Sequence, residues 1–138
     1  MLAVAHDAGM EPSRLWLCGQ GFAPLGWRDL DPQVRLVSDT RRQHLRGGWP
    51  AHLHRLAGGG VDAVNRRRRG WSAARVEQVH AAGLLAFGWD AQDSAALSGL
   101  LGWGCDAVYS DHVTAMTTAL RRHRAQGDPG HPDGPTKM

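Results

Sequence analysis

Residues 61–113 read VDAVNRRRRGWSAARVEQVHAAGLLAFGWDAQDSAALSGLLGWGCDAVYSDHV, and this stretch decides the fold class. Short apolar runs alternate there with helical patterns, in the order 61–65, 72–82, 84–89, 94–103 and 106–110. Short strands separated by helices are typical of βα units, which build a parallel sheet. The stretch therefore predicts a parallel α/β architecture.

The ends of these apolar runs carry side chains that can bind a ligand. They are Asn65, Trp89 and Asp111. Open α/β sheets and barrels place their chemistry at the carboxyl ends of their strands. For Trp89 two interpretations stay open, because a tryptophan supplies a large buried area in a core and can equally line a pocket mouth.

The chain before residue 61 supplies two more strand candidates, at 15–20 (LWLCGQ) and 34–38 (VRLVS). The first ends at Gln20, and a helix is expected to start near Pro50 and to end at the glycines 58–60. Residues 3–11 read as the tail of a helix that ends near Gly9, and 113–124 predict a final helix. The tally is five strands, each followed by a helix or a loop.

The 138 residues are expected to form one domain over 1–124, followed by a disordered tail over 125–138. A closed eight-fold barrel takes about 250 residues, so five units predict an open sheet. No apolar run approaches the roughly 20 residues of a membrane helix. The N-terminus MLAVAHDAGMEPSR has no basic start and is a poor signal peptide, so we expect a cytoplasmic protein without a membrane partner.

The net charge of +3 comes mostly from arginine, which supplies fifteen of the sixteen basic residues. This excess is typical of a biased genome composition, so nucleic acid binding is not expected from it. Arg66–Arg69 follow a strand end directly. They form either a solvated loop or a phosphate site in which Arg66 is nearest the strand end, because guanidinium groups bind phosphate oxygens bidentately.

Cysteine and histidine spacing gives little support for a metal or nucleophilic site. Cys18 and Cys105 lie in strand-like runs without a CxxC pair, and we expect two buried thiols rather than a disulfide. His44, His52 and His54 are expected to be surface histidines, and His80 to be packed in the core. No Gly-x-Ser-x-Gly elbow and no glycine-rich phosphate loop is present.

The order of these elements resembles the C-terminal half of the glycerophosphodiester phosphodiesterase family. That family closes its barrel with a strand ending in Trp-Thr-Val-Asn, a helix, and a glycine-valine-aspartate strand ending in Thr-Asp. The matching residues here are Trp89–Gln92 and Gly104–Asp111, and the preceding helix RVEQVHAAGL is similar to the family's helix. The resemblance implies a partial (β/α)8 TIM-type barrel of about the last five βα units.

The family cleaves glycerophosphodiesters to glycerol 3-phosphate and an alcohol by acid–base chemistry around a divalent cation, Ca or Mg. Its key residues lie in a His-Arg-Gly strand, a Glu-x-Asp strand and a His-Asp hairpin. This chain has none of these strands, and its only glutamates are Glu11 and Glu77. A hard divalent cation needs several converging carboxylate oxygens. We therefore expect no catalytic residue and no metal ligand in this chain, and no activity of the chain alone.

The resemblance leaves a substrate-binding role for the strand ends Trp89, Asn65, Gln20 and Asp111, with Trp89 packed against the glycerol or the leaving alcohol. Arg66 is the candidate for the phosphate. A glycerophosphodiester is then a partner only if the missing half is supplied. The first and last strands of a half-barrel leave unpaired edges, so pairing with another copy or with a partner chain is the alternative function.

Overall fold

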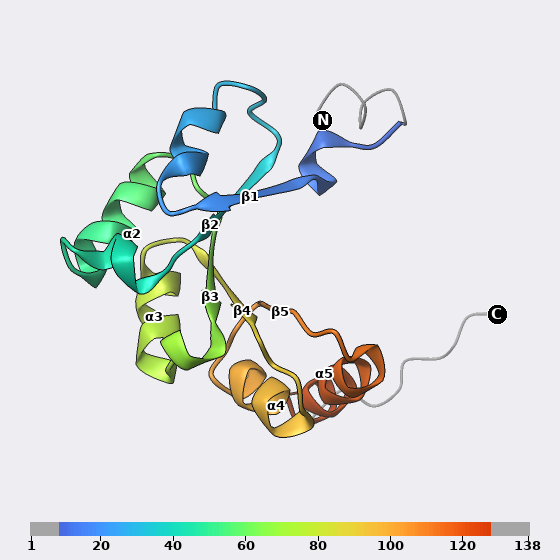
Figure 1. Ribbon diagram of the computed structural model, residues 1–138. Helices are drawn as coiled ribbons and strands as arrows, with labels where there is room; N and C mark the ends of the chain where they lie inside the picture. The colour runs from blue at the N-terminus through green and yellow to red at the C-terminus, as the bar shows by residue number, and fades with distance from the viewer. Residues whose placement is uncertain (1–8, 128–138) are drawn as a thin grey trace.

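The computed structural model describes residues 9–127, which form a five-stranded parallel sheet (Figure 1). Each strand pairs in parallel with the next one along the chain, so the order in the sheet is β1-β2-β3-β4-β5. The strands are β1 (Trp16–Gln20), β2 (Arg35–Asp39), β3 (Ala63–Arg67), β4 (Leu85–Trp89) and β5 (Ala107–Val108). The predicted parallel α/β class and the five predicted strands are confirmed.

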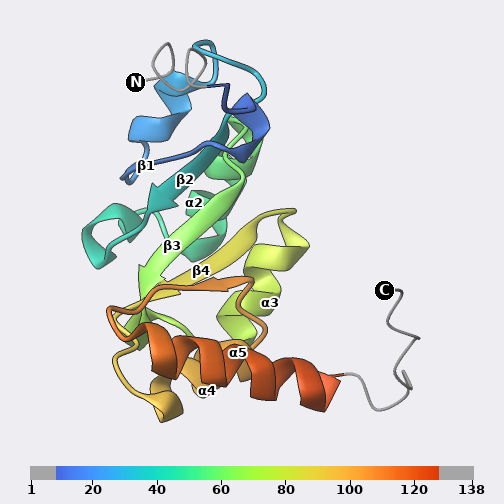
Figure 2. The ribbon, with the colours of Figure 1, turned by 90° about the vertical axis from the view of Figure 1, so that its right-hand side faces the viewer.

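The connections between strands run through helices that gather on one side of the sheet (Figures 1 and 2). The α-helices are α2 (Trp49–Gly58), α3 (Ala73–Ala81), α4 (Ser94–Gly102) and α5 (Val113–Gly127). Short 3-10 turns complete the connections: η1 (Pro12–Arg14), η2 (Ala23–Trp27), η3 (Arg42–Leu45) and η4 (Arg68–Gly70). No helix in the range 9–127 is long and apolar enough to cross a membrane.

Two of the helices begin at side chains that cap them. The Ser72 hydroxyl accepts a hydrogen bond from the Arg75 backbone N–H at 3.3 Å, and the Asp93 carboxylate accepts one from the Ala96 N–H at 2.7 Å. Such caps satisfy backbone donors that have no partner within the helix. They fix where α3 and α4 begin, within six residues of the ends of β3 and β4.

The amino edge of the sheet is pinned by two aspartates that precede alternate strands. The Asp62 carboxylate, before β3, accepts the N–H of Leu36 in β2 at 2.8 Å. The Asp106 carboxylate, before β5, accepts the N–H of Ala86 in β4 at 2.7 Å. Asp62 also pairs with the guanidinium of Arg28 at 3.0 Å. These contacts hold neighbouring strands together and leave the carboxyl edge free for a site.

The main core lies between the sheet and the helices. It joins apolar side chains of α2, α3 and α4 to the helix-facing side chains of β3 and β4, chiefly Leu56, Val64, Val76, Val79, Ala86, Leu97 and Leu100. Trp71 is 5% exposed and donates its indole N–H to the Phe87 carbonyl at 2.9 Å. This covered side carries most of the apolar burial that stabilises the fold.

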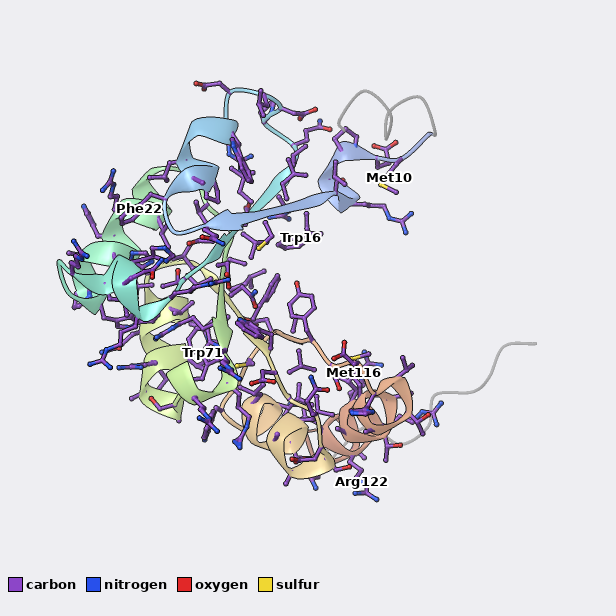
Figure 3. The ribbon with its side chains drawn as sticks, viewed as in Figure 1. Met10, Trp16, Phe22, Trp71, Met116 and Arg122 are labelled. Atoms are coloured by element: carbon purple, nitrogen blue, oxygen red, sulfur yellow. The ribbon has the colours of Figure 1, made fainter. Side chains whose placement is uncertain are left out.

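The opposite side of the sheet carries a smaller cluster, formed by Val37, Ala63 and Phe87. Phe87 contacts Trp16 and Tyr109, with ring centroids at 5.3 and 6.2 Å, so aromatic side chains from β1, from β4 and from the residue after β5 meet. Trp16 remains 40% exposed and Tyr109 49%. In Figure 3, Trp16 and Trp71 lie on opposite sides of the sheet. No described helix covers the Trp16 side.

Several element boundaries differ from the sequence predictions. β5 covers only Ala107–Val108 instead of 106–110, because Asp106 uses its side chain to bond β4 and the chain turns into α5 soon afterwards. α5 runs to Gly127 rather than ending at residue 124. Most of the helix predicted over 3–11, and the tail from 128 onward, lie outside the described residues.

Three predicted side-chain environments are wrong. Cys18 is exposed, because it points to the uncovered side of the sheet, whereas Cys105 is buried as expected, and both thiols are free. His52 is 3% exposed, since it shares a face of α2 with Leu56 one turn further on. The side chain of His80 is 40% exposed and contacts the Asp106 carboxylate at 2.7 Å. His80 lies at the margin of the buried face of α3.

Candidate functional site

A pocket of about 650 Å³ opens at the carboxyl edge of β2, β3 and β4. Six of its lining residues are arginines, contributed by the segment after β2, by the end of β3 with η4, and by the first turn of α3. We call it the arginine pocket; its lining residues are Thr40, Arg41, Arg42, Leu45, Arg66, Arg67, Arg69, Gly70, Arg75 and Trp89. The carboxyl ends of parallel strands are the usual position of a ligand site in this architecture.

Two of the six arginines are compensated by a carboxylate. Arg41 pairs with Asp39 at 3.2 Å, and Arg67 pairs with Asp90 at 2.5 Å. The other four are Arg42, Arg66, Arg69 and Arg75, and none of them lies within 4.0 Å of a carboxylate in the part of the chain that the structure describes. The arginine pocket therefore carries an excess of positive charge.

Arg66 is the most buried of these arginines, with 6% of its surface exposed. Its Nη1 donates to the Gly70 carbonyl oxygen at 3.0 Å, and its guanidinium carbon lies 5.0 Å from the centroid of the Trp49 ring. Burial, and then the charge of Arg75, lower the pKa of Arg66 to about 10. A guanidinium has five N–H donors, so the single protein acceptor of Arg66 leaves donors for a ligand.

Arg75 meets the same two groups from α3. Its Nη1 donates to the Gly70 carbonyl oxygen at 2.8 Å, and its guanidinium carbon lies 5.9 Å from the Trp49 centroid. A Cβ on Gly70 would lie 2.8 Å from the Cζ of Arg66, so only glycine leaves the guanidinium in this position. Two like charges are thus held beside one another around one carbonyl and one indole.

A chain of hydrogen bonds lies behind the arginine pocket. Ser38 donates its hydroxyl to the Gly21 carbonyl at 2.6 Å, so Ser38 accepts from the Thr40 hydroxyl at 3.0 Å. Thr40 then accepts from Nε2 of His52 at 2.9 Å, which makes Nε2 the protonated nitrogen of that ring. Burial, followed by the charges of His44, Arg66 and Arg55, lowers the pKa of His52 to about 4. His52 is therefore neutral at pH 7.

Trp89 ends β4 and forms one wall of the arginine pocket. Its indole N–H is buried and has no acceptor among the described residues, so it is a free donor. The Arg67 guanidinium carbon lies 5.7 Å from the Trp89 ring centroid. Asp90 follows with φ of 63°, and it is the one non-glycine residue with positive φ in the described range. Such a conformation costs energy and clusters at functional positions, which marks the turn after β4.

Trp89 also forms a wall of a second pocket, of about 550 Å³, which we call the β4–β5 pocket. Its other lining residues are Asp90, Gln92, Val108, Tyr109, Ser110, Asp111 and Met116. The Gln92 amide donates to the Asp111 carboxylate at 3.2 Å. Carboxylate, amide and hydroxyl groups beside an aromatic wall can bind a hydroxylated ligand. Trp89 therefore lines both a cationic pocket and a polar, acidic one.

The structure brings some of the predicted site residues together and leaves others apart. Trp89 and Asp111 line the β4–β5 pocket, and Trp89 and Arg66 line the arginine pocket. Asn65 lies beside Asp39, with its side-chain carbonyl buried and without a donor, and Gln20 is exposed at the end of β1. Neither Asn65 nor Gln20 lines these two pockets.

Sequence reasoning missed Thr40, Arg41, Arg42, Gly70 and Arg75 as neighbours of Arg66. One signal points to Arg75: the first turn of α3 contains a basic residue and no acidic one. Helix N-termini favour acidic side chains, so an arginine there calls for another explanation. Gly70 lies four residues after Arg66, and Thr40, Arg41 and Arg42 come near Arg66 through the pairing of β2 with β3.

Metal-ligating side chains are sparse near these pockets. Within residues 9–127, no three histidine, cysteine, aspartate or glutamate side chains lie close enough to hold a metal ion together.

Comparisons with known proteins agree with the sequence resemblance at the level of fold. No family model matches the chain, and no curated protein matches it. Solved structures do. A protein from Silicibacter pomeroyi assigned as a glycerophosphoryl diester phosphodiesterase matches with a TM-score of 0.71 and 18% identity, over 88% of this chain and 42% of its own.

Two further structures give the same result. An Agrobacterium tumefaciens protein with the same assignment matches with a TM-score of 0.73 and 16% identity, over 91% of this chain and 50% of its own. An Oleispira antarctica phosphodiesterase, solved in complex with the product sn-glycerol-3-phosphate, matches with a TM-score of 0.66 and 19% identity, over 87% of this chain and 48% of its own. The chain thus spans about half the length of these structures, and it has the fold of a partial glycerophosphodiester phosphodiesterase barrel.

Proposed function

We propose that this chain is the recognition side of a glycerophosphodiester site, and that it does not hydrolyse the ester by itself. The observation that carries the proposal is the position of Trp89, which forms a wall of both the arginine pocket and the β4–β5 pocket. A phosphate ester has an anionic group next to a hydroxylated or polar group. The two pockets offer those two chemistries, and Trp89 lines both of them.

In this proposal the phosphate group enters the arginine pocket, where Arg66 faces it from β3. The glycerol or the leaving alcohol packs against Trp89 and bonds to Asp111 in the β4–β5 pocket. The unpaired Trp89 indole N–H supplies one further donor. Asn65 and Gln20 lie at the same edge of the sheet, and their proposed contact with substrate rests on strand-end position alone.

Inactivity of the chain alone is supported by its donor set. Acid–base cleavage around a hard cation needs converging carboxylates, and residues 9–127 hold no such group. The proposed role is therefore binding and orientation of the ester. Hydrolysis would need residues from a second polypeptide segment, together with the divalent cation, calcium or magnesium, that they hold.

Calorimetric titration of the chain with sn-glycerol 3-phosphate and with glycerophosphocholine tests the binding claim. We expect saturable binding that Trp89→Ala weakens at least tenfold, equivalent to about 1.4 kcal/mol, because the substitution removes the side chain that lines both pockets. Trp103→Ala removes an indole that lies outside both pockets and is the matched control. Equal weakening by both substitutions, or no binding of either ligand, would remove the proposal.

An assay for released alcohol with calcium or magnesium tests the second claim. The expected result is no turnover above a protein-free blank. Turnover by the wild-type chain that is abolished by Trp89→Ala would refute the claim of inactivity, while it would leave the binding site in place.

A second candidate function is self-association, and one observation favours it. The uncovered side of the sheet exposes Trp16 and Tyr109, and among residues 9–127 no strand pairs with the outer edge of β1 or of β5. Unpaired edges and exposed aromatic side chains are typical of surfaces that bind another chain. Light scattering tests this second function. A dimer that Trp16→Ser converts to a monomer supports self-association, and a wild-type chain that is monomeric at high concentration opposes it.

A further inference from the structure

The cationic side chains of the arginine pocket include one arrangement that the proposed function does not require. Arg66 and Arg75 approach each other around the Gly70 carbonyl, with donor–acceptor distances of 3.0 and 2.8 Å to the same oxygen. A phosphodiester carries one negative charge at neutral pH, and one guanidinium would neutralise it. Two adjacent guanidinium groups without carboxylates match an anion that carries two charges.

We propose that Arg66 and Arg75 together bind a doubly charged phosphate group, so that the arginine pocket takes phosphomonoesters in preference to phosphodiesters. This inference rests on the proposed function, because it refines which phosphate the pocket binds. It assigns Arg75 and Gly70 to the site, beside Arg66.

The burial of Arg66 makes the excess positive charge of the arginine pocket unfavourable when no anion is bound. Arg66 is 6% exposed, so water compensates its charge poorly, and the charge of Arg75 repels it. Removing a charge from water without pairing it costs free energy, and a bound anion recovers that cost. A dianion compensates both guanidinium groups, whereas a monoanion leaves one of them uncompensated.

Neighbouring residues hold the two guanidinium groups in position. Trp49 lies within 5.0 and 5.9 Å of the two guanidinium carbons, and cation–π contact holds both groups near one indole. Gly70 leaves room for the Arg66 guanidinium, since a Cβ there would lie 2.8–2.9 Å from three of its atoms. A solvated arginine on a surface loop would need neither a glycine at that position nor a partly buried indole beside it.

A pocket-sized site also favours a small phosphate over a nucleic acid. A binding surface for single-stranded nucleic acid combines a long basic groove with several aromatic side chains. Here the uncompensated arginines converge on one pocket of about 650 Å³. The ligand class is therefore a phosphomonoester or inorganic phosphate, and not a phosphodiester chain.

Calorimetric titration of the full chain at pH 7.5 and pH 5.0 tests this inference. The ligands are sn-glycerol 3-phosphate, inorganic phosphate, sulfate, glycerophosphoglycerol as a diester, and a short single-stranded oligonucleotide. We expect the monoester to bind at least tenfold more tightly than the diester at pH 7.5. If sn-glycerol 3-phosphate binds more tightly than inorganic phosphate, the ligand is a phosphate ester. If the two affinities are equal, the ligand is free phosphate. Either outcome supports a site for a dianion.

The comparison of the two pH values shows whether a change in affinity comes from protonation of the ligand or from protonation of the protein. The second pKa of a phosphomonoester is about 6, so its affinity is expected to fall at pH 5.0, where it is a monoanion. The charged groups that line the pocket with Arg66 are Arg41, Arg42, Arg67, Arg69 and Arg75. The titratable group that interacts with Arg66 is His52 on α2, which itself interacts with His44 and Arg55. Sulfate stays a dianion at both pH values, so its affinity should be the same at both. If sulfate loses as much affinity at pH 5.0 as the monoester does, the loss arises from titration of the protein, and the inference is overturned.

Arg75→Ala is the decisive variant, because Arg75 is exposed and its removal leaves the core intact. It should abolish the preference for the monoester, whereas Arg68→Ala, which removes the same charge from η4 outside the pocket, should keep it. Equal affinity for monoester and diester, or tighter binding of the oligonucleotide than of the monoester, overturns this inference and leaves the proposed function standing. Binding of none of the ligands removes both.

Discussion

The guanidinium of Arg66 lies over the indole of Trp49, with its carbon 5.0 Å from the ring centroid. This pair joins the end of β3 to the start of α2, and it holds a buried positive charge at the carboxyl edge of the sheet. The contact has two consequences. It keeps Arg66 from reaching solvent, and it presents the remaining guanidinium N–H groups to the arginine pocket.

Gly70→Ala tests whether Gly70 positions that guanidinium. The new Cβ would lie 2.8 Å from Cζ of Arg66, so the flexible end of the side chain must move while the backbone can stay. We expect phosphate affinity to fall about tenfold, equivalent to about 1.4 kcal/mol, with a change in unfolding free energy of no more than about 0.5 kcal/mol. Gly99→Ala is the control, since nothing lies within 4 Å of its added Cβ. Unchanged affinity in Gly70→Ala would contradict the assignment.

His52 predicts how stability depends on pH. Its folded pKa is lowered to about 4 from the ordinary value of 6.5, so the unfolded chain binds a proton there that the folded chain does not. Stability from this group is complete above about pH 6.5 and decreases as the pH falls towards 4, by about 3 kcal/mol at most. Urea unfolding at pH 4.5, 5.5 and 7 measures this slope.

The matched variants for that experiment are His52→Gln and His54→Gln. The first removes the buried ring and should flatten the slope between pH 4 and 6.5. The second removes an exposed histidine of the same helix and should leave the slope as in the wild type. An equal slope in His52→Gln and the wild type would show that the acid sensitivity arises elsewhere.

Of the two aspartates at the amino edge of the sheet, Asp62 is predicted to contribute more to the free energy of unfolding. It accepts the Leu36 N–H and pairs with both Arg28 and Arg35, at 2.8, 3.0 and 3.1 Å. Asp62→Ala removes the side-chain acceptor of the Leu36 N–H and of Arg35, while Arg28 keeps the carbonyls of Pro32, Val34 and Gly60. We expect a loss of about 2 kcal/mol in unfolding free energy. Asp29→Ala, at an exposed position, should change it by less than about 0.5 kcal/mol. Equal small effects would mean that water replaces the Asp62 contacts.

Gly88 tests the close packing of β4 against α4. A Cβ there would lie 2.7 Å from a methyl group of Leu100, which is fully buried. Gly88→Ala should cost about 1–3 kcal/mol by overpacking. Gly102→Ala adds a methyl group where nothing lies within 4 Å and should not share this cost. A wild-type melting temperature in Gly88→Ala would show that α4 can move away.

Much of the fold could be predicted because it depends on local patterns. The spacing of Val76 and Val79, the cap at Ser72 and the glycines after the helices predict βα units, and the five strands occur where the apolar runs are. Environments that depend on contacts between distant segments could not be predicted. His52 is buried by its partner Thr40, and His80 is held at the surface by Asp106.

The candidate site shows the same division. Trp89, Asp111 and Arg66 could be selected because each lies at or shortly after the carboxyl end of a strand; Arg66 and Trp89 are within the last two residues of β3 and β4. The grouping of Arg66 with Thr40 depends on the pairing of β2 with β3. Its grouping with Gly70 and Arg75 depends on the path of the chain through η4 into α3 and on a close approach that only glycine allows. An arginine run in an arginine-rich sequence gives no indication of which members are buried.

The Trp89 indole N–H gives the most direct test of the central claim that this edge of the sheet binds a phosphate ester. In a ¹⁵N–¹H spectrum of the full chain, with the Trp89 signal assigned through Trp89→Phe, sn-glycerol 3-phosphate should shift the Trp89 indole signal saturably. The Trp103 signal should stay in place, because Trp103 lines neither pocket. An unshifted Trp89 signal at saturating ligand, or equal shifts of Trp89 and Trp103, would contradict the account.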